Sequence, residues 1–255
     1  MIAGGTSGLG LATARLLADG GHHLVLLSRD ADRAAAALST LPSGVRHVAG
    51  DARNPDDVES ALEQAAELAP LWGCVNSVGV PLTMRVLSHG RVHPQDLFEE
   101  CLLGNAATAF NLTRLVAAHL AGQPCPEDGE RGVIVHTAST AALDGQTGQA
   151  AYAAAKAAVT GMTLPLARDL AAQRIRVVTI APGLYDTPMA QEIPADTLSH
   201  LIGHVPHPQR LGRPEEFASL VVHVLNNQMI NGAVIRADAA FRLPDPQRNS
   251  AAHRP

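Results

Sequence analysis

A tyrosine and a lysine stand four residues apart in an alanine-rich stretch, at Tyr152 and Lys156. On a helix these two positions lie on the same face, about one turn apart. Because a nearby ammonium favours the phenolate, the spacing predicts that Lys156 lowers the pKa of Tyr152 from its ordinary value of roughly 10. Such a phenol serves as a general acid or base near neutral pH. Because the sequence holds only two tyrosines, one of them is less expected to fall in such a motif by chance.

Two polar residues upstream could complete a catalytic site. Ser139 follows the apolar run Val133–His136, and a serine at the carboxyl end of a parallel strand lies where ligands bind. Its hydroxyl could bind a substrate carbonyl oxygen beside Tyr152. Asn105 stands inside a helical stretch, where asparagine is mildly unfavourable, and could hold a water that relays protons from Lys156. The alternative is a helix-bending Asn105 with a satisfied side chain.

A glycine-rich turn opens the chain, with the spacing G-x-x-x-G-x-G at positions 4, 8 and 10. Such glycines permit a tight turn and let the backbone approach a pyrophosphate, while the helix that follows directs its first N–H groups at the phosphates. The turn therefore predicts phosphate contacts from Gly4, Ser7, Gly8, Leu9 and Gly10. The alternative is a glycine turn without a ligand.

The end of the second apolar run bears on the choice between two nicotinamide cofactors. An acidic residue there holds the ribose hydroxyl of NAD, whereas an arginine accepts the 2′-phosphate of NADP. Ser28 stands at the acidic position, Arg29 follows directly, and Asp30 comes two places late. These residues favour NADP(H) over NAD(H). The alternative is that Ser28 is a helix N-cap followed by a solvated charge.

Residues at the ends of further strands complete the predicted cofactor site. We expect Asp51 to accept a hydrogen bond from the adenine amine, although it could equally lead into a helix. Tyr185 could border the nicotinamide and Thr187 could bind its carboxamide, unless the two prolines of that segment merely fix a loop. The predicted set is Asp51, Ala52, Asn76, Ser77, Gly79, Pro182, Gly183, Tyr185 and Thr187, together with Tyr152 and Lys156.

Short apolar runs alternate with longer amphipathic stretches along the chain. This alternation predicts an α/β fold: one doubly wound domain with a parallel sheet flanked by helices on both faces. We expect strands at Leu24–Leu27, Val45–Val48, Leu71–Val75, Val133–His136, Val177–Ile180 and Ala233–Ile235. We expect helices at Leu9–Asp19, Asp30–Ser39, Pro55–Leu68, Gln95–Leu120, Gln149–Ala172 and Pro214–Leu225.

The two ends of the chain differ from this pattern. Only Met1–Ala3 precede the glycine turn, which is short for a central strand, so we expect the natural chain to begin upstream or to have been trimmed. The catalytic and cofactor-binding domain is predicted to span residues 1–243, and residues 244–255 to form a flexible polar tail.

Composition excludes several classes of function. The net charge is −5 and no basic block occurs, which argues against nucleic acid as a partner. No apolar run reaches the roughly 18 residues of a membrane helix. Three scattered cysteines, Cys74, Cys101 and Cys125, favour a reducing cytoplasm over a disulfide framework. His200, His204 and His207 lack a fourth ligand of metal type nearby, so no metal is predicted.

Taken together, the chain resembles the short-chain dehydrogenase/reductase family, whose fold is of the Rossmann type. The resemblance rests on the glycine turn, on Asn105, Ser139, Tyr152 and Lys156, and on the Pro182-Gly183 loop with Thr187. The segment from Arg131 to Arg236 is similar to a narrower group, the type-2 3-hydroxyacyl-CoA dehydrogenases, and Gln146 fits that group's pattern for a substrate contact.

The resemblance implies hydride transfer between a nicotinamide cofactor and a hydroxyl or ketone carbon. It implies a 3-hydroxyacyl or 3-oxoacyl thioester as the small-molecule partner and a homodimer or homotetramer. The sequence departs from the family's pattern at Ala3, where a threonine is usual. The more important departure is at Ser28-Arg29, because the type-2 dehydrogenases look NAD-dependent and have an aspartate at that position. One alternative is an NADPH-dependent reductase whose ketone substrate is a 3-oxoacyl group on a carrier protein or a steroid-like molecule. The other is a nucleotide-binding regulator that catalyses no reaction.

Overall fold

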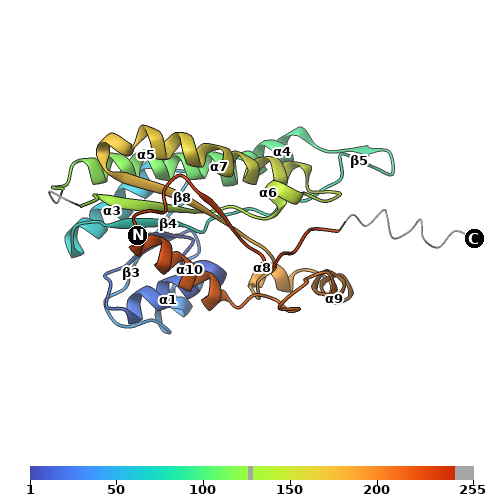
Figure 1. Ribbon diagram of the computed structural model, residues 1–255, viewed down its shortest axis with the longest axis horizontal. Coiled ribbons are helices and arrows are strands. Elements are labelled where there is room, and N and C mark those ends of the chain that lie inside the picture. Colours follow the sequence, from blue (N-terminus) through green and yellow to red (C-terminus); the bar gives the residue numbers. More distant parts are fainter. Residues whose placement is uncertain (126–128, 245–255) are drawn as a thin grey trace, which may run out of the picture.

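The computed structural model describes residues 1–125 and 129–244. A sheet of seven strands runs through it in the order β3-β2-β1-β4-β7-β8-β9, and every neighbouring pair is parallel. Helices cover both faces of the sheet (Figure 1), so the predicted doubly wound α/β fold is confirmed. In the described residues its strands are β1 (Ile2–Ala3), β2 (Val25–Ser28), β3 (Arg46–Ala49), β4 (Gly73–Asn76), β7 (Gly132–Thr137), β8 (Ile175–Pro182) and β9 (Val234–Ala237).

The apolar runs become strands because both faces of the sheet are covered. Ile134 in β7 and Val177 in β8 are completely buried. A strand that is buried on both sides has no polar face, and so its sequence is nearly continuous in apolar residues. β1 is the shortest strand of this sheet, and its Ile2 pairs with Leu26 on one side and Val75 on the other.

The helices form two layers. One layer holds α3 and α5 over an apolar cluster that includes Val58 and Leu112, and the other holds α1 and α10 over a cluster that includes Leu17 and Phe217. The longer helices are α1 (Gly8–Asp19), α2 (Ala31–Leu38), α3 (Pro55–Leu68), α4 (Gln95–Leu102), α5 (Thr108–Ala121), α7 (Ala150–Asp169), α9 (Ala195–Gly203) and α10 (Pro214–Asn226). The short ones are α6 (Ala141–Asp144), α8 (Pro188–Gln191) and the 3₁₀ turn η2 (Ala171–Gln173).

The single helix expected at Gln95–Leu120 is wrong in one respect. It consists of α4 and α5 joined by a π-helical segment, η1 (Leu103–Ala107), and Asn105 lies in the middle of that segment. π-helical turns inside α-helices are rare and frequently occur at functional sites. The apolar periodicity continues on both sides of η1, and so the sequence pattern conceals the interruption.

A hairpin of β5 (Leu87–Ser88) and β6 (Arg91–Val92) lies outside the main sheet and was not expected from the sequence. Its turn residues His89 and Gly90 both have positive φ, at 48° and 75°, which is the backbone of a two-residue hairpin. Figure 1 shows the hairpin, α6, α8 and α9 gathered at the end of the molecule remote from the N-terminus.

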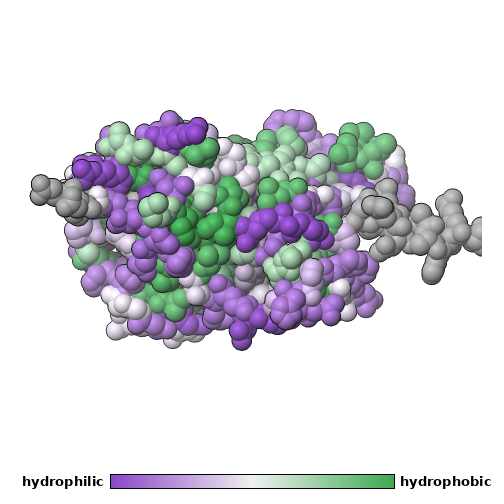
Figure 2. Space-filling view, in the orientation of Figure 1, coloured by the Kyte–Doolittle hydropathy of each residue, from purple (hydrophilic) through white to green (hydrophobic). Residues whose placement is uncertain are grey.

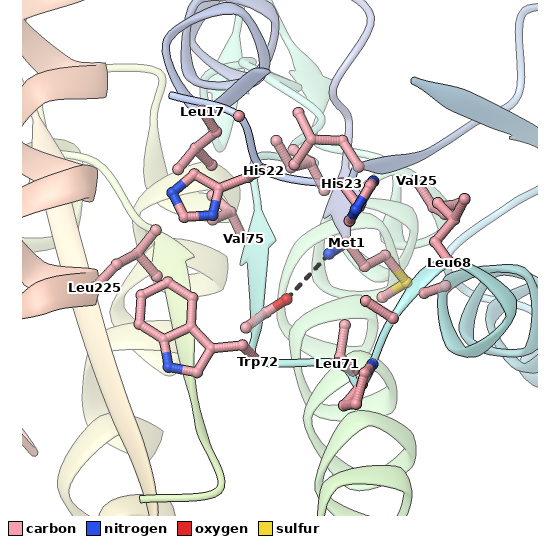
Figure 3. A pocket seen from close by; sticks show the side chains of 17 residues that line it. Met1, Leu17, His22, His23, Val25, Leu68, Leu71, Trp72, Val75 and Leu225 are labelled. Atoms are coloured by element: carbon pink, nitrogen blue, oxygen red, sulfur yellow. Dashed lines mark hydrogen bonds between the residues drawn. The ribbon is translucent and has the colours of Figure 1, made fainter. Parts of the chain in front are cut away.

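A cavity of about 220 Å³ lies at the opposite, amino end of the sheet (Figure 3). Met1 projects into it, and its amino group donates a hydrogen bond of 3.0 Å to the Gly73 carbonyl oxygen. The rings of His22 and Trp72 stack at its wall, 6.1 Å apart. None of the residues assigned above to catalysis or cofactor binding lines this cavity.

Apolar and polar side chains alternate over the surface, and Figure 2 shows a group of apolar residues near the middle of the face drawn in Figure 1. Within residues 1–125 and 129–244, no helix is both long and apolar enough to cross a membrane. The predicted flexible tail, residues 244–255, lies outside the described residues except for its first residue, Pro244.

Candidate active site

The carboxyl ends of the parallel strands collect the predicted site residues at one edge of the sheet. The first is the glycine turn between β1 and α1. Gly4 has a φ of +76°, and a Cβ there would lie 2.9 Å from the backbone of Ser77. A Cβ at Gly10 would collide with the Gly4 carbonyl oxygen. Both positions therefore require glycine for the turn itself, whether or not a ligand is bound.

The N-terminus of α1 offers donors to an anion. Ser7 is the N-cap residue, but its side chain makes no capping hydrogen bond, and the first turn contains no acidic residue. The unpaired N–H groups of the first helical turn and the positive end of the helix dipole favour a negatively charged group there. Leu9 and Gly8 lie in this turn, and a Cβ at Gly8 would approach Thr187 to 3.4 Å.

At the end of β2, Ser28 is not the N-cap of the following helix, so this alternative for Ser28 is wrong. The N-cap of α2 is Asp30, whose carboxylate accepts a 2.9 Å hydrogen bond from the backbone N–H of Arg33. Ser28 is not a cap: its hydroxyl lies 3.0 Å from Nε2 of His47 in β3. The side chain of Arg29 is 69% exposed and reaches within 4.0 Å of the Asp51 carboxylate. The carboxylate of Asp30 is thus held by its own helix, and the Arg29 guanidinium faces solvent.

Asp51 follows β3 and is paired by an arginine that the sequence analysis did not single out. The Arg53 guanidinium donates two hydrogen bonds to its carboxylate, at 2.7 and 2.9 Å, and one to Glu100 at 2.8 Å. The backbone N–H of Arg53 donates another to the Asp51 carboxylate at 2.9 Å. These contacts with Arg53 hold the pKa of Asp51 below its ordinary value although burial opposes them. Asp51 also leads into α3, because its carbonyl oxygen accepts a hydrogen bond from the N–H of Asn54, the N-cap of that helix.

Ala52 is buried, and its carbonyl oxygen accepts a 3.0 Å hydrogen bond from Nδ2 of Asn111 on α5. This contact fixes the loop after β3 against the helix layer.

The turn after β4 reaches the middle of the site. A Cβ at Gly79 would lie 2.9 Å from Nζ of Lys156 and 3.2 Å from Oδ1 of Asn105, so the turn, the lysine and the asparagine are in direct proximity. Oδ1 of Asn105 accepts from the Val80 N–H at 3.2 Å, and its Nδ2 donates to the Val80 carbonyl at 3.1 Å. Nδ2 also donates to the Cys101 carbonyl at 2.8 Å. The asparagine side chain is therefore fully satisfied inside η1.

Tyr152 and Lys156 share one face of α7, with Nζ of the lysine 5.9 Å from the centre of the tyrosine ring. Nζ donates a 3.0 Å hydrogen bond to the Thr137 carbonyl, and burial lowers the pKa of Lys156 to about 8. The predicted lowering of the pKa of Tyr152 is wrong for this structure. Burial raises it to about 12, and a hydrogen bond with the Ser139 hydroxyl only partly offsets that rise.

Among the described residues, two buried hydroxyls at this edge have no hydrogen-bond partner, and they test whether a nicotinamide cofactor fits. They belong to Ser77, behind the glycine turn, and Thr137, beside Lys156. Buried polar groups are nearly always paired, so each orphaned hydroxyl marks a position where a ligand or water supplies the missing partner. Together with the open first turn of α1, these atoms fit a nicotinamide dinucleotide along the edge.

The loop after β8 carries the remaining predicted residues. The Pro182 carbonyl accepts from the Thr140 N–H, and the Gly183 N–H donates to Ala237. Thr187 is the N-cap of α8 and accepts a hydrogen bond of 3.4 Å from the Ala190 N–H.

The ring of Tyr185 packs edge-on against Phe217, at 6.1 Å, so it belongs to the apolar layer under α10. Gln146, beyond α6, is partly exposed and contacts Gln149.

His200 lies in α9, and His204 and His207 follow that helix. In the described part of the chain no group of three or more His, Cys, Asp or Glu could hold a metal ion. The rings of His200 and His204 pack against each other 4.5 Å apart, and Nδ1 of His204 bonds to the His200 carbonyl.

The distribution of lysine and arginine along the chain also singles out Lys156. Lys156 is the only lysine among 19 Lys and Arg residues, so the chain uses arginine for every other fixed cation. Arginine stays charged in proteins, whereas a lysine changes its pKa readily when buried. The only lysine is also buried, and this burial lowers its pKa to about 8.

The geometry and the comparisons with known proteins agree. A family model described as short chain dehydrogenase matches residues 1–198, and the chain belongs to this family of oxidoreductases. It is similar to the 3-hydroxyacyl-CoA dehydrogenase type-2 of Drosophila melanogaster, with 42% identity over 95% of this chain and 96% of the relative. The protein of that name from Homo sapiens is 41% identical over 95% of this chain and 94% of the relative.

A solved structure extends the agreement to the fold. The crystal structure of 3-hydroxyacyl-CoA dehydrogenase type-2 from Mycobacterium avium superposes with a TM-score of 0.91 at 38% identity, over 95% of both chains. The resemblance stated from the sequence is thus confirmed, as is the assignment to enzymes that use NAD(H) or NADP(H).

Proposed function

We propose that this protein catalyses reversible hydride transfer between a nicotinamide cofactor and the C3 position of a 3-hydroxyacyl or 3-oxoacyl thioester of coenzyme A. The observation that carries it is the meeting of Ser139, Tyr152, Lys156 and Asn105 beside two orphaned hydroxyls at the carboxyl edge of the sheet. The chain's similarity to 3-hydroxyacyl-CoA dehydrogenases supports the thioester.

In this proposal the bound cofactor supplies or accepts the hydride. The Ser139 hydroxyl binds the substrate oxygen, and the Tyr152 hydroxyl donates a proton to it during reduction or accepts one during oxidation. Lys156 holds the cofactor ribose through its ammonium group, which lies 5.9 Å from the centre of the Tyr152 ring. Asn105 fixes the Val80 backbone and supports the proton relay.

The reaction is tested by absorbance at 340 nm with acetoacetyl-CoA as the probe. We expect Tyr152→Phe to lose at least about 10²-fold in turnover, since positioned acid–base catalysis contributes that much, and to keep cofactor affinity. Near-normal turnover in Tyr152→Phe would refute the role of the phenol. An inert acetoacetyl-CoA beside an efficiently reduced small ketone would refute the thioester. Firm cofactor binding without turnover of any ketone would favour a regulator.

For the cofactor we propose NADP(H) over NAD(H). Ser28 brings no carboxylate to the end of β2, and Asp30 is engaged as a helix cap. The Arg29 guanidinium is exposed and only loosely paired, 4.0 Å from Asp51, so it could turn toward a 2′-phosphate. We expect the wild type to favour NADPH in kcat/KM, and Ser28→Asp combined with Arg29→Leu to shift the preference toward NADH. A wild type that prefers NADH severalfold would refute this choice. Because the guanidinium is exposed, the preference should weaken at high salt.

We also propose a homodimer or homotetramer. Leu103, Phe110 and Leu164 expose 50%, 50% and 45% of their surface on η1, α5 and α7. Large apolar side chains gathered on one helix layer favour association. Light scattering after size exclusion tests this, and a strictly monomeric species at micromolar concentration would contradict it.

A further inference from the structure

A histidine is buried within the central sheet, directly before the catalytic segment. His136 in β7 is 1% exposed, and the next residues along the chain are Thr137, whose carbonyl binds Lys156, and, two further on, Ser139. The proposed reaction assigns no role to this imidazole. Histidine is polar and titratable, and so its burial in an otherwise apolar strand requires hydrogen-bond partners.

The partners form one chain of hydrogen bonds whose direction is fixed at both ends. The Val78 N–H can only donate, and it donates to Oδ1 of Asn76 at 3.0 Å. Nδ2 of Asn76 therefore faces Nδ1 of His136, at 3.2 Å, and Nδ1 must accept. Nε2 then carries the proton and donates to the Thr113 hydroxyl at 2.9 Å, which in turn donates to the Ala109 carbonyl at 2.8 Å.

The chain requires a neutral imidazole. A second proton on Nδ1 would point at the Asn76 amide hydrogens, and turning the amide over would break its bond with Val78. Burial, helped by the charge of Lys156, lowers the pKa of His136 to about 4. The imidazole is therefore neutral at physiological pH, and its protonated nitrogen is Nε2.

This chain holds one end of the turn that borders the reactive groups. His136 secures the turn at Asn76, and Asn105 secures its other end by accepting from the Val80 N–H and donating to the Val80 carbonyl. Between the two anchors, Gly79 lies against Nζ of Lys156. Loss of either anchor frees the backbone that borders the cofactor and the lysine.

We infer that His136 is a positioning residue, whose Nε2-protonated imidazole orients Asn76 and so keeps the turn from Asn76 to Val80 in place for the nicotinamide end of the cofactor. The inference rests on the proposed function for its ligand. It assigns His136 no contact with cofactor or substrate.

The first experiment examines the hydrogen-bond chain without any ligand. Protein labelled with ¹⁵N-histidine is measured by long-range ¹H–¹⁵N correlation between pH 5.5 and 8, and His136→Gln identifies the signal among the 12 histidines. We expect one histidine to remain neutral and protonated on Nε2 throughout. A His136 that titrates in this range, or carries its proton on Nδ1, overturns the inference.

The second experiment measures the dissociation constants of NADPH and NADH by nicotinamide fluorescence. We expect His136→Leu, which removes both polar atoms, to weaken binding of the preferred cofactor about tenfold, and His136→Gln, which can both accept and donate, to stay within about threefold of the wild type. We expect Asn76→Ala to add little to His136→Leu, because both break the same link. Additive losses, or wild-type affinity in His136→Leu, overturn the inference.

Thr163→Val is the matched control, since Thr163 is 1% exposed and bonds to Thr179 at 2.6 Å away from the turn. It should lower the Tm while leaving both dissociation constants unchanged, and an equal loss of affinity there would show that His136 acts through general stability. If His136→Leu does not fold, Thr113→Val is used instead, because it removes the hydrogen bond between Thr113 and Nε2 of His136. Wild-type cofactor affinity in Thr113→Val would then overturn the inference. If the wild type binds neither cofactor, the proposed function is refuted. The tautomer measurement, which needs no ligand, still tests the chain of hydrogen bonds through His136.

Discussion

Replacing Lys156 by methionine should stabilise the protein while abolishing its activity. The amine is completely buried, and its pKa falls from 10.5 to about 8 because burial penalises the charged form. At 1.36 kcal/mol per pKa unit, a charged Lys156 costs the folded state about 3 kcal/mol. Methionine has a similar length and no charge, so Lys156→Met removes this penalty.

Part of the gain is lost with the hydrogen bond from Nζ to the Thr137 carbonyl. An unsatisfied buried carbonyl costs about 1 kcal/mol or more, which leaves a net stabilisation of about 2 kcal/mol at pH 7. For a chain of 255 residues this corresponds to a Tm higher by roughly 4–8 °C. The buried charge thus represents stability given up for function.

The pH dependence has a definite sign. Below pH 8 the amine is charged in both the folded and the unfolded state, and the wild type carries the full penalty. Between pH 8 and 10.5 the folded state releases its proton first, so the free energy of unfolding of the wild type rises with pH relative to that of Lys156→Met. Above 10.5 the penalty has vanished, and the wild type keeps the benefit of its hydrogen bond.

The measurement is the difference in Tm between the wild type and Lys156→Met at pH 7, 8, 9 and 10, in which the titration of other groups largely cancels. Because Lys156 is the only lysine, ¹³C-lysine labelling gives one side-chain signal whose titration reports its pKa directly. A Tm difference that does not change with pH, or a lysine signal that titrates near 10.5, would refute the reasoning.

Three further outcomes are expected. Gly79→Ala places a methyl group 2.9 Å from Nζ of Lys156, so turnover should fall at least about tenfold while the Tm changes little; unchanged turnover would contradict the contact. Arg176→Met removes a buried guanidinium that binds Glu130 and three backbone carbonyls, so chemical denaturation should show a loss of about 3–5 kcal/mol, and a loss below 1 kcal/mol would show that the pair is dispensable. Ala240→Gly relieves a φ of 60° and should raise the Tm by a few degrees, whereas a lower Tm would mean that the strain is compensated.

The sequence predicted the sheet and its active edge because both depend on local patterns. Runs such as Val133–His136 are apolar on both faces, and the carboxyl ends of parallel strands must lie together. It follows that Ser139 and Tyr152, 13 residues apart, meet at one edge.

The remaining features depend on tertiary contacts. Burial by the surrounding helices sets the pKa of Tyr152, and spacing along a helix contains no information about that burial. The N-cap went to Asp30 rather than Ser28 because the strand runs to Ser28, whose hydroxyl is then engaged by His47. Arg53 reached Asp51 only through the geometry of the loop.

The π-helical segment η1 bears on how this protein can change over evolutionary time. Each residue of an α-helix turns the chain by roughly 100°, so deleting one residue from Leu103–Ala107 to restore a regular helix would rotate everything that follows. Leu112 and Val116, now buried in α5, would turn away from the sheet, and the apolar core would open. The unusual backbone that presents Asn105 is therefore tied to packing two turns away. A lineage could lose catalysis by substituting the asparagine, but it could remove the irregular turn only together with compensating changes throughout α5.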